Sequence, residues 1–194
     1  MIVTGNLEKS AEYYSEIYRQ GYDTQGYYPL YQLVVRFLDS FPSPRVLELG
    51  CGIGDLGRMI IARGYPYRGF DFSKEAIARC KQVCPEGNFF VGNIYNPAGF
   101  LPVDYNVAVA LEVLEHVDDL RVMEYLPPGV RLIASVPDYD DAAHLRLYKD
   151  IQQDIIERYR PYLHVVEVAT ATAANAQTGL KQSIHILSAI KTLA

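Results

Sequence analysis

The sequence predicts an α/β protein, a three-layer α/β/α sandwich around a Rossmann-like, seven-stranded, mostly parallel sheet with a C-terminal antiparallel β-hairpin. From residue 45 onward, short apolar segments alternate with amphipathic helical segments, which is typical of a parallel sheet covered by helices on both faces. The last two strand-like segments, "HVVEVATAT" and "SIHILSAIK", have no helix between them. They are therefore expected to pair antiparallel at one edge of the sheet.

The strands share short apolar runs that end at polar or glycine-rich turns. Parallel strands are expected at 45–49, 67–72, 88–92, 105–111 and 130–137, and the hairpin strands at 164–172 and 183–191. The segment "YNVAVAL" is apolar nearly throughout, as a parallel strand buried on both faces should be.

The helices share apolar residues at three- and four-residue spacing. They are expected at 8–20, 29–41, 55–64, 74–84, 118–126 and 149–159. The tripeptide "PSP" ends the second helix, and Gly64 closes the third. Ser73 is expected to cap the amino end of the fourth.

Length and composition predict one domain over residues 1–194, with a helical, tyrosine-rich segment at 1–44 and a catalytic core at 45–194. The net charge of −5 argues against a nucleic-acid partner. No apolar run approaches the roughly 20 residues that a membrane helix needs. The amino terminus lacks a signal-peptide pattern, and three cysteines do not form a disulfide framework, so buried thiols in the cytoplasm are expected.

A glycine loop, "ELGCGIGDLG", follows the first of these strands and opens a helix. Its spacing, Gly52-x-Gly54-x-x-Gly57 with Asp71 19 positions after Gly52, matches the dinucleotide fingerprint. Glu48 would repel a pyrophosphate at this loop, whereas it would attract a ligand that carries an ammonium and a sulfonium. The residues therefore favour S-adenosylmethionine over a nicotinamide cofactor.

Three motifs in order resemble the class I S-adenosylmethionine-dependent methyltransferases, and in particular their small-molecule branch. They are "VLELGCGIGDLG", "GFDFS" and "VALEVLEHVDD". Together with the final strand pair, the resemblance covers roughly residues 45–190. It implies a methyltransferase that uses S-adenosyl-L-methionine and releases S-adenosyl-L-homocysteine.

The resemblance also implies a set of cofactor-binding residues at the strand ends. With Tyr18 from the N-terminal segment, they are Glu48, Gly50, Cys51, Gly52, Asp71, Phe72, Asn93, Ile94, Leu111 and Glu112. The loop would meet the methionine portion, and Glu48 would support the loop and its ammonium group. Asp71 would accept from the ribose hydroxyls and Phe72 would pack on the adenine. Asn93 stands where many relatives have aspartate.

The segment "SAEYYSEIYRQGYDTQGYYPLY" carries a cluster of tyrosines before the first parallel strand. It fits a stripe that packs on the domain, and it also fits a lid over the carboxyl ends of the strands. Tyr14, Tyr18 and Tyr22 are the lid candidates. Gly21 and Gly26 could act as hinges.

The stretch "LEVLEHVDD" has three interpretations. In the first, Glu115 is exposed and stabilises a helix start through the helix dipole. In the second, His116 and His144 are catalytic, because an alcohol or ammonium acceptor must lose a proton. The third rests on a resemblance to small-RNA 2′-O-methyltransferases acting on 3′ ends, in which Glu112, Glu115, His116 and His144 would hold a divalent cation.

The preferred hypothesis is methyl transfer to oxygen or nitrogen of a small molecule, without a metal. The alternatives are a metal-dependent RNA 3′-end 2′-O-methyltransferase and a non-catalytic module that binds S-adenosylmethionine. A dehydrogenase is the least favoured, because of Glu48.

Overall fold

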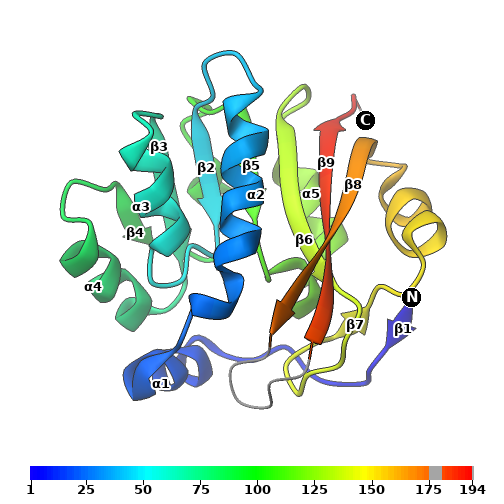
Figure 1. Cartoon of the computed structure of the whole chain (residues 1–194), viewed down its shortest axis with the longest axis horizontal. Coiled ribbons are helices and arrows are strands. Elements are labelled where there is room, and N and C mark those ends of the chain that lie inside the picture. The colour runs from blue at the N-terminus through cyan, green and yellow to red at the C-terminus, as the bar shows by residue number, and fades with distance from the viewer. Residues whose placement is uncertain (175–180, 194) are drawn as a thin grey trace.

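A seven-stranded sheet forms the centre of the molecule. The computed structural model describes residues 1–174 and 181–193. The strand order is β4-β3-β2-β5-β6-β9-β8 (Figure 1). The strands are β2 (Val46–Leu49), β3 (Tyr67–Asp71), β4 (Phe89–Val91), β5 (Val107–Ala110), β6 (Arg131–Pro137), β8 (Leu163–Ala174) and β9 (Lys181–Lys191).

The pairing confirms the predicted topology. The first five strands of this order are parallel, whereas β9 pairs antiparallel with both β6 and β8. The chain reverses direction across the sheet between β2 and β5, and such a switch point leaves a crevice beyond the carboxyl ends of the strands.

Helices cover both faces of the sheet. They are α1 (Ala11–Gly21), α2 (Tyr28–Asp39), α3 (Asp55–Ala62), α4 (Lys74–Val83) and α5 (Asp119–Tyr125), with short turns η1 (Gln25–Tyr27), η2 (Pro97–Phe100) and η3 (Leu114–His116). The Ser73 side chain accepts from the Ala76 amide, which confirms the predicted cap of α4. No helix of the described residues is long and apolar enough to cross a membrane.

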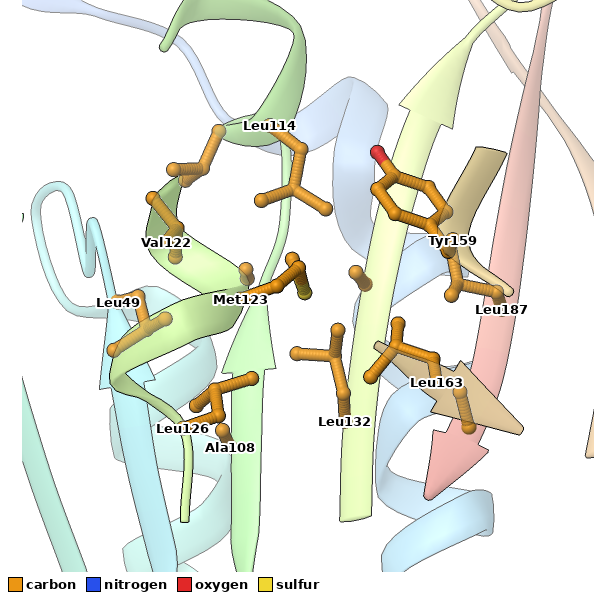
Figure 2. Close-up of a cluster of buried hydrophobic side chains, with 14 of the residues drawn as sticks. Leu49, Ala108, Leu114, Val122, Met123, Leu126, Leu132, Tyr159, Leu163 and Leu187 are labelled. Atoms are coloured by element: carbon orange, nitrogen blue, oxygen red, sulfur yellow. The ribbon is translucent and has the colours of Figure 1, made fainter. Parts of the chain in front are cut away.

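Two clusters of buried side chains, one on each face of the sheet, hold the sheet and the helices together as three layers. On one face, Val46, Val107 and Ile133 of the sheet pack with residues of α2 and α3. On the other face, α5 covers the sheet through Val122 and Met123 (Figure 2). Because alternate residues of one strand point to opposite faces, strands β2, β5, β6 and β9 contribute to both clusters. The three cysteines are buried and free, as predicted.

The N-terminal segment crosses the carboxyl end of the sheet (Figure 1). Strand β1 (Ile2–Val3) pairs antiparallel with β7 (Arg146–Leu147), which was not predicted because both strands are two residues long. The terminal ammonium of Met1 forms an ion pair with Asp154. The chain then reaches α1, which packs on α4.

The last predicted helix differs in its winding. It is a π-helix, η4 (Ile151–Glu157), and not an α-helix. At its start the Asp154 carboxylate accepts from the amides of Lys149 at 2.8 Å and Asp150 at 3.0 Å. These bonds satisfy backbone donors that the preceding loop leaves without a helical partner.

A buried ion-pair network supports the region beyond β5. Asp119 is fully buried and accepts a bidentate pair of bonds from Arg158, at 2.8 and 2.6 Å. Arg146 lies 3.2 Å from the same carboxylate and donates to the carbonyls of Leu114 and Val117. The network therefore fixes the turn that carries Glu115 and His116.

Candidate active site

The glycine loop lies at the switch point, directly after β2. Gly50, Gly52 and Gly54 have φ angles of 68°, 53° and 86°, a region in which other residues are strained. A Cβ on Gly50 would lie 2.6 Å from a methyl group of Val113, so this position also lacks space for a side chain. Gly57 is a packing residue, because a Cβ there would lie 2.5 Å from the Tyr67 hydroxyl.

Asp71 ends β3 beside this loop. Its carboxylate accepts from the amides of Gly52 at 3.1 Å and Ser73 at 2.8 Å, and the residue is 5% exposed. Burial raises the pKa of Asp71 to about 6, against the lowering effect of the two amide donors. Asp71 is thus held in place by the backbone and retains lone pairs for a polar ligand.

Two neighbouring cavities open along the strand ends. Asp71, Phe72, Asn93, Ile94 and His116 line the first, called here the Asp71 cavity. The second, called here the tyrosine cavity, is lined on one side by four tyrosines of the N-terminal segment, Tyr18, Tyr22, Tyr27 and Tyr31. On its other side it is lined by Glu48, Gly50, Cys51, Gly52, Asp55, Leu111 and Glu112.

The two cavities bring the predicted cofactor residues together. Each of the eleven cofactor-binding candidates lines one cavity or the other. Tyr18, Gly50 and Glu112 line both, so they mark the place where the cavities meet. Of the two catalytic candidates, His116 lines the Asp71 cavity, whereas His144 is not among the lining residues of either.

Glu48 is buried behind the loop. Its carboxylate accepts from the Tyr67 hydroxyl. Burial raises the pKa of Glu48 to about 8, and this hydrogen bond opposes the shift. The carboxylate thus faces the tyrosine cavity without a basic partner among the described lining residues.

Glu112 follows β5 with a φ of 52°, which is unusual for a residue with a side chain. Its amide donates to the Ser135 hydroxyl at 2.7 Å, and that hydroxyl donates back to the carboxylate at 2.8 Å. The Tyr139 hydroxyl donates to the other carboxylate oxygen at 2.9 Å. Three hydrogen bonds therefore hold a strained residue at the meeting point of the cavities.

The tyrosines of α1 lie over the site. The Tyr14 ring lies 5.4 Å from the Phe72 ring and 5.8 Å from the His116 ring, measured between centroids. The Ser15 and Ser73 hydroxyls are 2.8 Å apart and join α1 to the start of α4. The segment therefore covers the cavities, and its movement as a lid stays a prediction.

The expectation for Glu115 was wrong. Glu115 is fully buried, and neither carboxylate oxygen has a hydrogen-bond partner among the described residues. Helix α5 instead begins at Asp119, with the Asp118 side chain accepting from the Arg121 amide. Glu115 lies within the turn η3, before that helix start, and its side chain is buried there, so burial and nearby Glu112 raise the Glu115 pKa.

The two histidines lie side by side, with ring centroids 4.9 Å apart. His144 is buried, although its segment is polar, because Tyr139 packs against it. Nδ1 of His116 lies 3.0 Å from the Ala143 carbonyl, and Nδ1 of His144 lies 3.0 Å from the Tyr139 carbonyl. Since a carbonyl only accepts, Nδ1 carries the proton in each ring and Nε2 is left as an acceptor.

Nε2 of His116 lies 3.5 Å from a carboxylate oxygen of Glu115. One atom each of Glu115, His116 and His144 lies within 4.8 Å of the others, so these three could hold a metal ion. Burial lowers the pKa of His116 to about 4, and the neutral ring is therefore the form present near neutral pH. Glu112 is committed to Ser135 and Tyr139 and does not join this cluster.

Several site residues escaped the sequence analysis. Ser135 lies on β6 and reaches Glu112 only in the folded chain. Glu8 and Lys9 line the Asp71 cavity from the segment before α1. Tyr27 and Tyr31 belonged to the tyrosine cluster, which was the one available signal for them.

A family model described as a methyltransferase domain matches residues 22–177. A comparison with curated protein sequences gives no match.

Several solved structures share the fold. The 1,6-didemethyltoxoflavin-N1-methyltransferase of Burkholderia thailandensis, with bound 1,6-didemethyltoxoflavin and S-adenosylhomocysteine, has a TM-score of 0.70 and 16% identity over 94% of this chain and 87% of that one. Magnesium protoporphyrin IX methyltransferase from Synechocystis PCC 6803, with bound SAH, has a TM-score of 0.66 and 18% identity over 86% of this chain and 84% of that one. The methyltransferase domain of a bacterial Hen1 (CtHen1-CN) has a TM-score of 0.61 and 18% identity over 81% of this chain and 96% of that one.

Proposed function

The chain belongs to the methyltransferase-domain family and is an S-adenosylmethionine-dependent methyltransferase of the class I fold, and from this premise we propose that it methylates oxygen or nitrogen of a small molecule. The observation that carries the proposal is that Glu112 lines both cavities. This residue therefore lies at the place where the two cavities meet. A ligand that fills both cavities would pass this point.

The residues present fit S-adenosylmethionine. Asp71 would accept from the ribose hydroxyls, and Phe72 and Asn93 would contact the adenine in the Asp71 cavity. Glu48 and the loop at Gly50 would receive the ammonium end in the tyrosine cavity, where carboxylates suit a cationic ligand. When bound, this cosubstrate supplies an activated methyl group on a thioether leaving group.

His116 is the proposed general base. Its Nε2 accepts while Nδ1 is held by the Ala143 carbonyl, and the residue lines the Asp71 cavity. His144 packs on its ring and is proposed to keep it in place. An oxygen or nitrogen acceptor would lose its proton to this acceptor atom.

The test is calorimetry with S-adenosylmethionine and S-adenosylhomocysteine, followed by transfer of labelled methyl groups to a panel of small alcohols, phenols and amines. His116→Asn should lower turnover by about 100-fold, within the range for a lost general base, while S-adenosylhomocysteine affinity is unchanged. His164→Asn, on an exposed part of β8, is the matched control. Equal turnover in His116→Asn and His164→Asn would refute the role of His116.

A second candidate is a metal-dependent methyltransferase of RNA 3′ ends. The cluster of Glu115, His116 and His144 favours it, because a buried carboxylate without partners faces two acceptor nitrogens. Carboxylate and imidazole together suit divalent transition metals, and a carbonyl behind each imidazole is the usual support for a metal ligand.

This candidate predicts methylation of a short RNA at its 3′ end in the presence of Mn²⁺, lost on addition of a chelator and in His144→Asn. The protein should carry no polyhistidine tag, which would bind metal itself. If the protein methylates small molecules at the same rate with and without chelator, the result would support the first candidate.

A further inference from the structure

The tyrosine cavity has acidic side chains in its lining. Glu48, Asp55 and Glu112 line it, and the described lining residues include no lysine, arginine or histidine. An anionic acceptor would therefore meet acidic side chains and no basic side chain in this lining. The cosubstrate accounts for Glu48, which has a proposed role in holding it, and Asp55 is paired with Arg58 at 3.7 Å. Glu112 remains, and it faces the point at which the cavities meet.

The wall opposite Glu112 is aromatic. The hydroxyl of Tyr27 interacts with those of Tyr22 and Tyr139, and the Tyr139 hydroxyl donates to Glu112. The Tyr18 and Tyr22 rings stand edge to face, with centroids 5.5 Å apart. Burial raises the pKa of Tyr22 and Tyr27, so both hydroxyls stay neutral. Tyrosine rings next to a fixed carboxylate form a surface that attracts a cation through both ring faces and charge.

We propose that the methyl acceptor is an amine, bound through its cationic nitrogen against the Glu112 carboxylate and the tyrosine wall, where this cavity meets the Asp71 cavity. The nitrogen gives one proton to the proposed base, His116, and its lone pair then forms the bond to the methyl group while S-adenosylhomocysteine leaves as the thioether. The inference rests on the proposed function and narrows its acceptor from oxygen or nitrogen to nitrogen. A neutral alcohol of the same shape would gain neither the charge–charge attraction nor the cation–π contact. A carboxylate of the same shape would be repelled.

The experiment uses the full chain saturated with S-adenosylhomocysteine and measures binding by calorimetry. The probes are two sets, and the members of each set share one carbon skeleton. The first set is phenethylamine, 2-phenylethanol and phenylacetate, and the second is butylamine, butanol and butyrate. At least one amine should bind about tenfold more tightly than its alcohol, with the acid weakest. Alcohols that bind as tightly as the amines, or a panel in which no amine binds, would overturn the inference.

Two variants test the assigned residues. Glu112→Gln keeps the shape and removes the charge, so the preference for amine over alcohol should fall to less than about threefold. Tyr139→Phe should also lower the preference for amine over alcohol. This variant replaces Glu112→Gln as the test if Glu112→Gln fails to fold. Glu12→Gln removes a charge from an exposed position of α1 and should leave the preference intact.

A preference that survives both Glu112→Gln and Tyr139→Phe would overturn the assignment. Failure of S-adenosylhomocysteine to bind the unaltered protein is a different result. It would refute the proposed function itself, whereas loss of amine preference with intact S-adenosylhomocysteine binding refutes the choice of acceptor alone.

Discussion

The two halves of the site are held in different ways. The cofactor half comprises residues 48–54 and 71–73, and its key carboxylate, Asp71, is fixed by backbone amides of Ser73 and of Gly52 in the loop after β2. The acceptor half comprises residues 14–31, 112–117 and 135–146, and its key carboxylate, Glu112, is fixed by side chains 23 and 27 residues away. The cofactor half depends on loop geometry, and the acceptor half depends on tertiary packing.

The largest expected effect is on stability, and it comes from a substitution in the ion-pair network that supports the acceptor half. Asp119→Asn removes the charge that pairs with Arg146 and Arg158 and should lower the free energy of unfolding by about 3 kcal/mol, because a buried carboxylate is lost from two partly buried guanidinium groups. Urea denaturation measures it. Asp140→Asn, at an exposed loop position, is the control. A loss no larger than that of the control would show that the network does not support this half.

The next effect isolates the cofactor half. Asp71→Ala should weaken S-adenosylhomocysteine binding by about 100-fold, since two hydrogen bonds to a charged acceptor are lost. Calorimetry measures it, and the unfolding free energy should change far less than in Asp119→Asn. Unchanged affinity would mean that Asp71 does not contact the cosubstrate.

The pH dependence sharpens this assignment. The pKa of Asp71 is raised to about 6, so the carboxylate proposed to accept from the ribose hydroxyls is the main form only above that pH. S-adenosylhomocysteine affinity should therefore reach its full value about one pH unit above this pKa and fall as the pH drops through it. Asp71→Asn should bind S-adenosylhomocysteine weakly, and its affinity should not change with pH near 6. If the affinity of Asp71→Asn still falls near pH 6, a group other than Asp71 titrates there.

The smallest expected effect comes from removing the Ser135 hydroxyl, which donates to the Glu112 carboxylate. Ser135→Ala removes one of the two donors to that carboxylate and should lower methyl-transfer turnover by about tenfold, corresponding to about 1–2 kcal/mol for one hydrogen bond to a charged group. S-adenosylhomocysteine affinity should not change. Ser183→Ala, on β9, is a serine control at a partly exposed position.

The same division explains what the sequence predicted. Strand order follows from alternating patterns and the missing helix before β9, and the cofactor half follows from a contiguous loop motif and Asp71, so both could be predicted. The burial of Glu115 could not, because it depends on a single short turn. Nor could the link from Tyr139 to Glu112 or from Arg146 to Asp119, since each joins residues 27 apart through packing.

The most direct test compares S-adenosylhomocysteine binding in Asp71→Ala and Tyr139→Phe with the unaltered protein, by calorimetry under one set of conditions. Division of the site into a cofactor half and an acceptor half predicts one-to-one binding that falls about 100-fold in Asp71→Ala and stays within about threefold in Tyr139→Phe. Equal losses in the two variants, or no binding to the unaltered protein, would contradict it.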